Sequence, residues 1–234
     1  MFYTYLNNAI VVGSLLLELA VVVYLLKGPY LKYPILLAYC VTELLTGSAE
    51  FMVSSYGSHE VFIRLYYIDE VGVDLLLFLM VITLTYRAMH GNPMRVAAGR
   101  VLGFITILVL ALPFLLFYPS IHDFAVFFNS AGEVLNFGAA IMNLVLWTAL
   151  LGATQRDAQL LTVSTGLGLQ VTAQAIGFGI RHFMSPRHRW MPDLFMTVAH
   201  LGSVYIWWRA FRPPSRRGVA PMAPSPSKIH PGQV

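Results

Sequence analysis

Acidic side chains occur inside long apolar segments of this chain, where an isolated charge is costly. Seven of the eleven Asp and Glu residues lie well inside these segments: Glu18, Glu43, Glu50, Asp69, Glu70, Asp74 and Glu133. A carboxylate at the centre of a membrane costs ~2.5–3.5 kcal/mol on insertion scales, so such residues usually face a bundle interior and mark a functional site. Too few Lys or Arg residues lie at comparable depth to pair with them. Shared protons, amide groups or a bound cation must therefore stabilise several of these acids.

The spacing of the polar residues places them on shared helix faces. Tyr66, Glu70 and Asp74 recur every four residues and line one face of a helix. A comparable stripe in residues 31–54 contains Tyr39, Glu43, Thr46 and Glu50. Residues 123–151 carry a seam with alternating steps of four and three residues, typical of a helix–helix contact, at Asn129, Glu133, Asn136, Ala140 and Asn143.

The remaining apolar segments add further polar side chains at helical spacing. Residues 158–181 contribute Gln170 and Gln174 with Arg181 beyond them, and residues 192–211 contribute Asp193, Thr197 and His200. We predict that the stripes converge on one polar core that opens toward the outer side and narrows inward. The predicted ion- or ligand-binding residues are Glu43, Glu50, Glu70, Asp74, Glu133, Asn136, Gln170, Gln174 and His200.

Some of these polar residues have a structural interpretation instead. Amide and hydroxyl side chains at helix interfaces often serve only as packing contacts, worth ~0.6 kcal/mol per hydrogen bond on average. Asn143, Gln170 and Thr197 fit that interpretation as well as a functional one. Glu18 stands alone in the first segment, where it is either a buried protonated acid bonded to a neighbour or a functional group.

The elements that position these residues are seven long apolar segments. The 234 residues are 57% apolar and only 11% charged, against about 25% charged in soluble domains. A membrane-spanning helix needs roughly 20 apolar residues. We therefore predict an all-α integral membrane protein, a seven-transmembrane-helix bundle over residues 1–212, followed by a disordered Pro/Ser/Arg-rich tail at 213–234. The predicted spans are 5–26, 31–54, 61–88, 98–118, 123–151, 158–181 and 192–211.

The distribution of basic residues predicts the orientation. With the N-terminus outside, eleven of the fifteen Lys and Arg residues face the cytoplasm and four face outward, as the positive-inside rule requires. The four outer residues are Arg64, Arg181, Arg187 and Arg189. Because the basic residues lie at helix ends and in the cytoplasmic tail, we predict no nucleic-acid partner. The lipid bilayer of the cell (inner or plasma) membrane is the expected environment, and Glu18 in the first apolar run favours a retained helix over a cleaved signal peptide.

The sequence predicts no metal and no cofactor. Cys40 is the single cysteine, which excludes an intramolecular disulfide. His200 is the one histidine well inside a segment, and although acids with one histidine could take a divalent cation, no ligand spacing indicates such a site. The seven-helix layout is similar to that of rhodopsins, but residues 192–211 contain no lysine to form a retinal Schiff base.

Three functions fit these observations. The first is a transporter or channel-like protein for protons or a small cation. The second is a receptor or sensor that binds a small polar or cationic ligand from the outer side and signals through a cytoplasmic partner protein. The third is an intramembrane enzyme that acts on a lipid or isoprenoid by carboxylate acid/base chemistry. The lack of a nucleophile or cofactor motif makes the enzyme the least favoured of the three.

Overall fold

The computed structural model describes residues 2–28, 30–56, 59–152, 157–185, 188 and 190–212. These residues form seven α-helices and no strand, which confirms the predicted all-α class. The helices are α1 (Phe2–Lys27), α2 (Pro34–Tyr56), α3 (His59–Ala88), α4 (Arg95–Leu116), α5 (Phe124–Leu151), α6 (Ala158–Phe183) and α7 (Trp190–Phe211), with a short 3-10 helix η1 (Tyr118–Ser120) before α5. The predicted tail, 213–234, and Arg156, Arg187 and Arg189 lie outside the described residues.

Three of the seven helices are long and apolar enough to cross a membrane: Ala9–Lys27 within α1, α4 and α5. Helices α2, α3, α6 and α7 are less apolar, because they carry most of the acidic and amide side chains singled out above. All predicted segments coincide with a helix, and their ends agree to within about three residues.

Local sequence signals explain several helix boundaries. Asp157 caps α6 by accepting hydrogen bonds from the backbone N–H groups of Gln159 and Leu160, at 3.0 and 3.1 Å. Asp123 caps α5 in the same way through Val126 N. Acidic side chains are favoured at these positions because they satisfy free N–H groups of the first turn. Between α3 and α4, Gly91 adopts a φ of 86°, in the left-handed region that glycine tolerates without strain.

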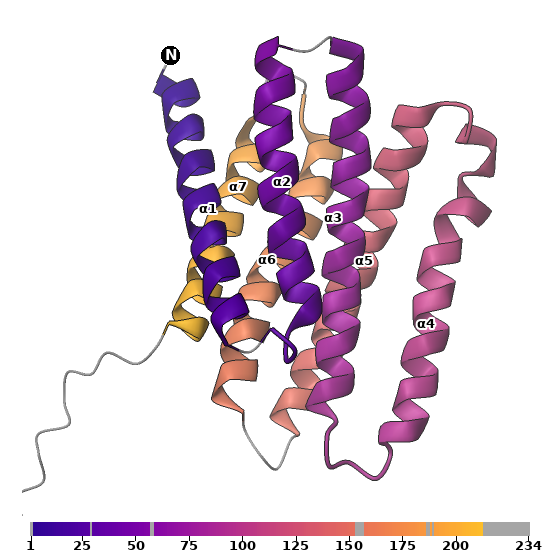
Figure 1. Ribbon diagram of the computed structural model, residues 1–234. Helices are drawn as coiled ribbons and strands as arrows, with labels where there is room; N and C mark the ends of the chain where they lie inside the picture. Colours follow the sequence, from indigo (N-terminus) through magenta and orange to yellow (C-terminus); the bar gives the residue numbers. More distant parts are fainter. Residues whose placement is uncertain are drawn as a thin grey trace, which may run out of the picture.

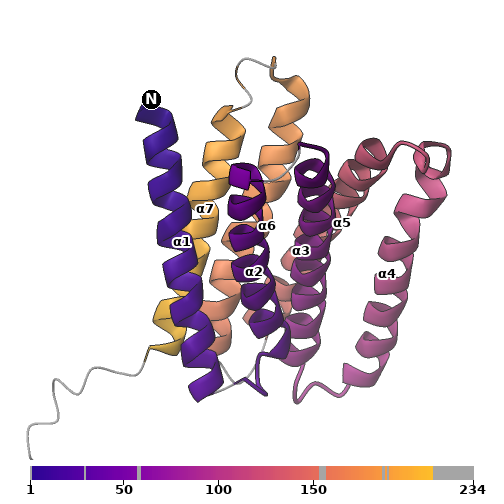
Figure 2. The same ribbon diagram turned by 45° about the horizontal axis from the view of Figure 1, so that its top comes forward.

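Six of the helices form a closed ring. Their contacts follow the order α1, α2, α3, α5, α6 and α7, and α7 returns to α1. Helix α4 lies outside this ring against α3 and α5, at the edge of the molecule furthest from α1 (Figures 1 and 2). Successive helices alternate in direction, so the N-terminus and the α2–α3, α4–α5 and α6–α7 connections share one end, drawn at the top of Figure 1. We refer to it as the upper end.

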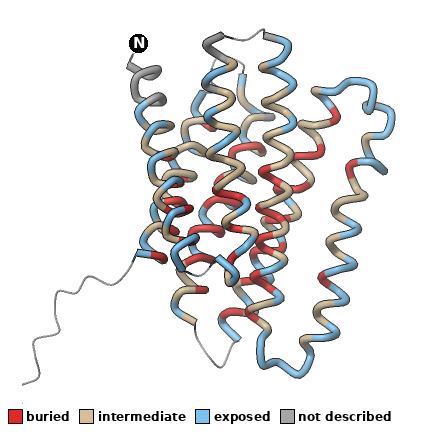
Figure 3. Tube along the Cα trace, viewed as in Figure 1, coloured by how far each residue is buried: buried red, intermediate tan, exposed pale blue. Residues whose placement is uncertain are grey.

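The apolar core fills the lower and middle parts of the ring. Near the upper ends of α2 and α3 the chain is intermediate or exposed, and it becomes buried further down (Figure 3). The largest fully buried side chains include Trp207, Phe78, Leu25 and Leu36. The upper half therefore has room for polar groups, whereas the lower half is closely packed.

An ionic contact ties the ends of three helices together at the lower end. Lys32, between α1 and α2, donates to Asp157 over 2.8 Å and to Gln159 over 3.2 Å, and Arg87 of α3 donates to the backbone carbonyl of Lys32. Partial burial alone would raise the pKa of Asp157, but the hydrogen bonds from Lys32 and from two backbone N–H groups outweigh it. The pKa of Asp157 therefore lies below its ordinary value.

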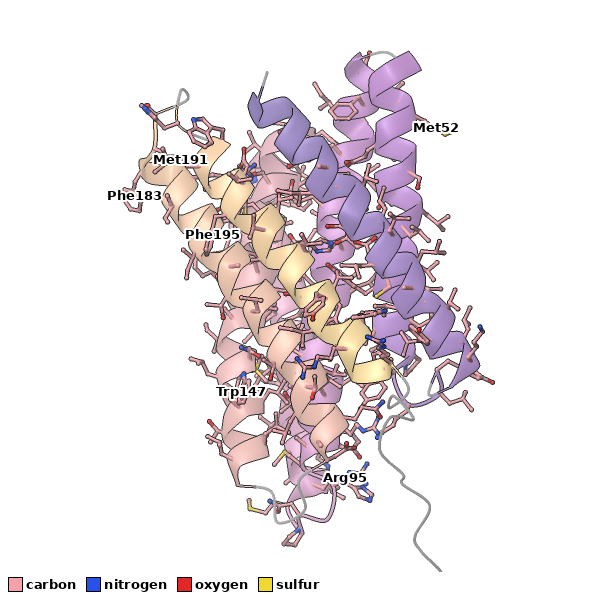
Figure 4. All side chains as sticks on the ribbon, turned by 90° about the vertical axis from the view of Figure 1, so that its left-hand side faces the viewer. Met52, Arg95, Trp147, Phe183, Met191 and Phe195 are labelled. Carbon is pink, nitrogen blue, oxygen red and sulfur yellow. The ribbon has the colours of Figure 1, made fainter. Side chains whose placement is uncertain are left out.

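Apolar side chains cover the exterior of the bundle on every side. Met52, Phe183, Met191 and Phe195 point away from the helix axes (Figure 4). Exposed large apolar side chains occur on all seven helices, including those that carry the acidic stripes. Soluble monomers rarely expose contiguous apolar areas of this extent.

Candidate functional site

The acidic stripes of α2 and α3 meet the amide stripe of α6 and the polar face of α7 around one cavity in the upper half of the bundle. The cavity has a volume of about 290 Å³. Its lining consists of Glu43, Glu50, Tyr66, Asp69, Glu70, Val73, Asp74, Gln170, Gln174, Phe178, Arg181, Met196, Thr197 and His200. Seven of the nine predicted binding residues are in this lining: Glu43, Glu50, Glu70, Asp74, Gln170, Gln174 and His200.

The other two predicted residues, both on α5, lie beside this cavity. Glu133 lines an adjoining pocket of about 300 Å³ together with Asn129 and Asp193. The two spaces share Tyr66, Glu70, Phe178 and Arg181. Asn136 lies one turn further along α5, where it is buried and donates to the carbonyl of Gly132 over 3.1 Å.

On each of three helices, a glutamate accepts a hydrogen bond from the side chain that lies one turn earlier. Tyr39 donates to Glu43 over 2.7 Å on α2, and Asn129 donates to Glu133 over 3.1 Å on α5. Tyr66 makes the corresponding contact with Glu70 over 3.5 Å on α3. Residues four apart lie on the same face of a helix, so these pairs follow directly from the sequence spacing.

Gly132 allows the carboxyl of Asp74 to approach α5 closely. Asp74 is only 2% exposed, and a Cβ added at Gly132 would lie 2.9 Å from Asp74 Oδ2. A larger residue at this position would push the carboxyl away from α5. The sequence stripes identified Asp74 but gave no indication of this glycine, because a close approach between two helices depends on how they pack.

The titratable side chains around the cavity are predominantly acidic. Five carboxyl groups line it, from Glu43, Glu50, Asp69, Glu70 and Asp74. Arg181 is the one Lys or Arg side chain in the lining, and its guanidinium is paired with Asp193 at 2.7 Å. His200 in turn is paired with Glu18. Arg181 and His200 thus each contact an acid that does not line this cavity.

Several oxygen atoms around the cavity have no hydrogen-bond partner among the described residues. They include Asp69 Oδ1, Asp74 Oδ2, Gln170 Oε1 and Gln174 Oε1. All four atoms are buried, and all four belong to residues that line the cavity. Oxygen acceptors without donors favour a ligand that brings positive charge or N–H and O–H groups. Asp69 was absent from the predicted binding residues because it lies off the stripe formed by Tyr66, Glu70 and Asp74.

The lower end of the cavity is formed by a cluster of four residues from three helices, Glu18, Tyr39, Glu43 and His200. His200 Nε2 of α7 lies 2.7 Å from Glu18 Oε1 of α1, and His200 Nδ1 lies 3.4 Å from the Tyr39 hydroxyl of α2. Glu18 is 2% exposed. One of the two interpretations of Glu18, the buried acid, requires a bonded neighbour, and His200 lies at the position of that neighbour.

An apolar layer closes the bundle below this cluster. Trp207 packs its ring against Tyr39 with ring centroids 5.6 Å apart, and its indole N–H donates to Val163 O over 3.0 Å. Val21, Leu25 and Leu36 surround this region and are almost completely buried. The polar cavity thus ends about halfway through the bundle.

Comparison of the chain with protein-family models, with curated proteins and with solved structures finds no match in any of the three.

Proposed function

We propose that the chain is a seven-span membrane protein with its upper end outside the cell and its lower end in the cytoplasm. The apolar exterior of all seven helices supports this, because polar groups gather in the ring while large apolar side chains face outward. The less apolar helices α2, α3, α6 and α7 fit the same environment, since their polar stripes face one another. Lys27, Lys32, Arg87, Arg95 and Arg209 lie toward the lower end, as expected for a cytoplasmic side.

We further propose that the protein binds protons or a small cation in the acidic cavity and moves them across the membrane. The observation that carries this proposal is the convergence of five carboxyl groups on a space in which the one Arg and the one His are already paired with other acids. Such a space attracts positive charge and disfavours anions. Its volume suits a small cation with part of its hydration shell. Carboxylates inside a membrane bundle commonly mark ion or proton paths.

A sensor that binds a cationic ligand from outside is the second candidate. The apolar layer formed by Val21, Leu25, Leu36 and Trp207 favours it, because a sensor needs no path through the lower half of the bundle. A transporter requires this layer to open in a second conformation. Cation binding without transport is therefore the outcome that would distinguish a sensor from a transporter.

The test is ion flux into proteoliposomes, measured with an internal pH dye and with several cations under an imposed potential of either sign. Wild type is compared with Asp74→Asn and Glu43→Gln, which remove carboxylates of the cavity, and with Glu133→Gln in the adjoining pocket. Glu60→Gln is the matched control, since Glu60 pairs with Arg64 on an exposed part of α3. Size-exclusion chromatography and circular dichroism establish the folded fraction of each variant.

We expect flux in wild type and in the Glu60 variant, and its loss in the Asp74 and Glu43 variants. Flux no greater than that of empty liposomes, across all cations and both polarities, would refute transport. Flux that persists in both cavity variants would show that the ions do not pass through this cavity.

A further inference from the structure

Three side chains of metal-ligand type meet at the lower end of the cavity. Glu18 of α1, Glu43 of α2 and His200 of α7 each offer a ligand atom within 4.8 Å of the other two. Glu43 and His200 line the cavity, which gives a route of entry. The sequence did not indicate this arrangement, because the three ligands lie on three different helices and share no spacing.

An unpartnered oxygen points to a bound cation at this position. Glu18 is 2% exposed, yet its Oε2 has no hydrogen-bond partner among the described residues. Ser14 lies one turn earlier on the same face of α1, is 6% exposed, and its Oγ also has no partner there. Burying a carboxylate oxygen without a donor is costly, and coordination to a metal ion removes that cost.

The histidine is already oriented as a metal ligand. In metal sites the second ring nitrogen is usually held by a hydrogen bond, which fixes the ring and the tautomer. Here Nδ1 faces the Tyr39 hydroxyl at 3.4 Å, and that hydroxyl donates to Glu43 Oε1 over 2.7 Å. Nε2 is then the ligand atom, and it lies 2.7 Å from Glu18 Oε1.

We propose that Glu18, Glu43 and His200 bind one divalent transition-metal cation, for which Zn²⁺ is the best match. One imidazole with two carboxylates suits Zn²⁺ and its neighbours, whereas Mg²⁺ and Ca²⁺ prefer oxygen ligands alone. The proposal deepens the proposed function and rests on it, since it names the class of cation taken by the deepest part of the acidic cavity. Binding would replace the hydrogen bond between Nε2 and Glu18 Oε1 with two metal–ligand bonds.

The geometry needs only a small adjustment. Zinc bonds to imidazole nitrogen and carboxylate oxygen are about 2.0–2.2 Å long, so ligand atoms around a tetrahedral ion lie roughly 3.4 Å apart. The Nε2–Oε1 pair must open slightly from 2.7 Å, and the widest pair must close from no more than 4.8 Å. Rotations of the two glutamate side chains can supply both movements.

The test measures metal binding by the full chain purified in detergent and stripped with a chelator. Zn²⁺ is titrated by calorimetry and counted by elemental analysis, Co²⁺ is used for its visible absorption, and proton release is recorded on Zn²⁺ addition. We expect one ion per chain, with affinity at least about tenfold lower in Glu18→Gln and His200→Gln. Tyr39→Phe keeps the ligands but frees the ring, so affinity should fall about 10- to 100-fold with unchanged stoichiometry.

Two control variants alter similar groups elsewhere in the chain. Glu60→Gln changes an exposed acid that pairs with Arg64 on α3, and His122→Gln changes an exposed histidine before α5, so both should bind Zn²⁺ like wild type. No stoichiometric Zn²⁺ binding by wild type would overturn the proposal, as would binding that survives both Glu18→Gln and His200→Gln. If Glu18→Gln does not fold, His200→Gln and Tyr39→Phe decide the result.

Together with the flux experiment, the Zn²⁺ measurements distinguish failure of the metal site from failure of the proposed transport. Zn²⁺ binding that depends on Glu18 and His200, without flux of any cation, would support the metal site and refute transport. Flux that depends on Asp74, without Zn²⁺ binding, would support transport and refute the metal site.

Discussion

Gly166 of α6 lies against Trp207 of α7, so replacing it with alanine would place a methyl group in occupied space. A Cβ at this position would lie 2.5 Å from Trp207 Nε1, 2.8 Å from Trp207 Cδ1 and 3.1 Å from Ser203 O. Trp207 is completely buried, and its Nε1 donates to Val163 O. The indole therefore cannot move aside without weakening that hydrogen bond, and the backbone of α7 must move as well.

Three effects determine the change in the free energy of unfolding. Overpacking a core contact costs about 1–3 kcal/mol. Weakening the Trp207 hydrogen bond costs about 1 kcal/mol. The higher helix propensity of alanine offsets about 1 kcal/mol of this. We expect Gly166→Ala to destabilise the protein by about 1–3 kcal/mol.

Equilibrium unfolding in mixed detergent micelles, followed by circular dichroism, measures this change. The matched control is Gly103→Ala on α4, where an added Cβ meets nothing within 4 Å. The control should be more stable than wild type by about 0.5–1 kcal/mol, because only the backbone effect operates there. A Gly166 variant as stable as the Gly103 variant would refute the close packing of α6 on α7.

Two further predictions concern the lower end and the cavity. Asp157→Asn keeps an N-cap acceptor but loses the ion pair with Lys32, so it should lower the free energy of unfolding by no more than about 1 kcal/mol at pH 7. Asp157→Ala loses the cap as well and should lower the free energy of unfolding by about 1 kcal/mol more. Because the pKa of Asp157 is lowered in the folded protein, the ion-pair contribution is fully present above the unfolded pKa of about 3.9 and is lost as the pH falls through the lower pKa of the folded protein. The difference in Tm between wild type and Asp157→Asn should therefore shrink as the pH of thermal melts is lowered below about 5, and a constant difference would contradict this. Gly132→Ala places a Cβ 2.9 Å from Asp74 Oδ2, so it should reduce cation flux with helicity unchanged, and undiminished flux would show that Asp74 does not need this approach.

Helix positions and the faces of the acidic stripes could be predicted from the sequence. Apolar runs and helix-capping residues act locally, so the helix ends agree closely with the predicted segments. The four-residue spacing of Tyr66, Glu70 and Asp74 is also local, which explains why it identified a shared lining. The apolar residues are less evenly distributed among the helices than expected. Among the described residues, three helices are long and apolar enough to cross a membrane.

The order of the helices in the ring could not be predicted, and the deepest part of the site depends on it. Glu18 is isolated on α1, and it reaches His200 only because α7 closes the ring against α1. The approach of Asp74 to Gly132 likewise depends on the packing of α3 on α5. Spacing within one helix carries no information about either contact.

The position of the Glu18–His200 pair constrains how a transport cycle could work. Glu18 and Leu25 are seven residues apart, or about 10 Å along α1, and Val21, Leu25, Leu36 and Trp207 below the pair are apolar and buried. An ion held by Glu18, Glu43 and His200 would link α1, α2 and α7, which are the helices that line this layer with Leu25, Leu36 and Trp207. Release toward the lower end therefore requires those helices to separate. The same cluster would couple occupancy of the cavity to the closed state of the apolar layer, which is the conformational coupling that either a transporter or a sensor needs.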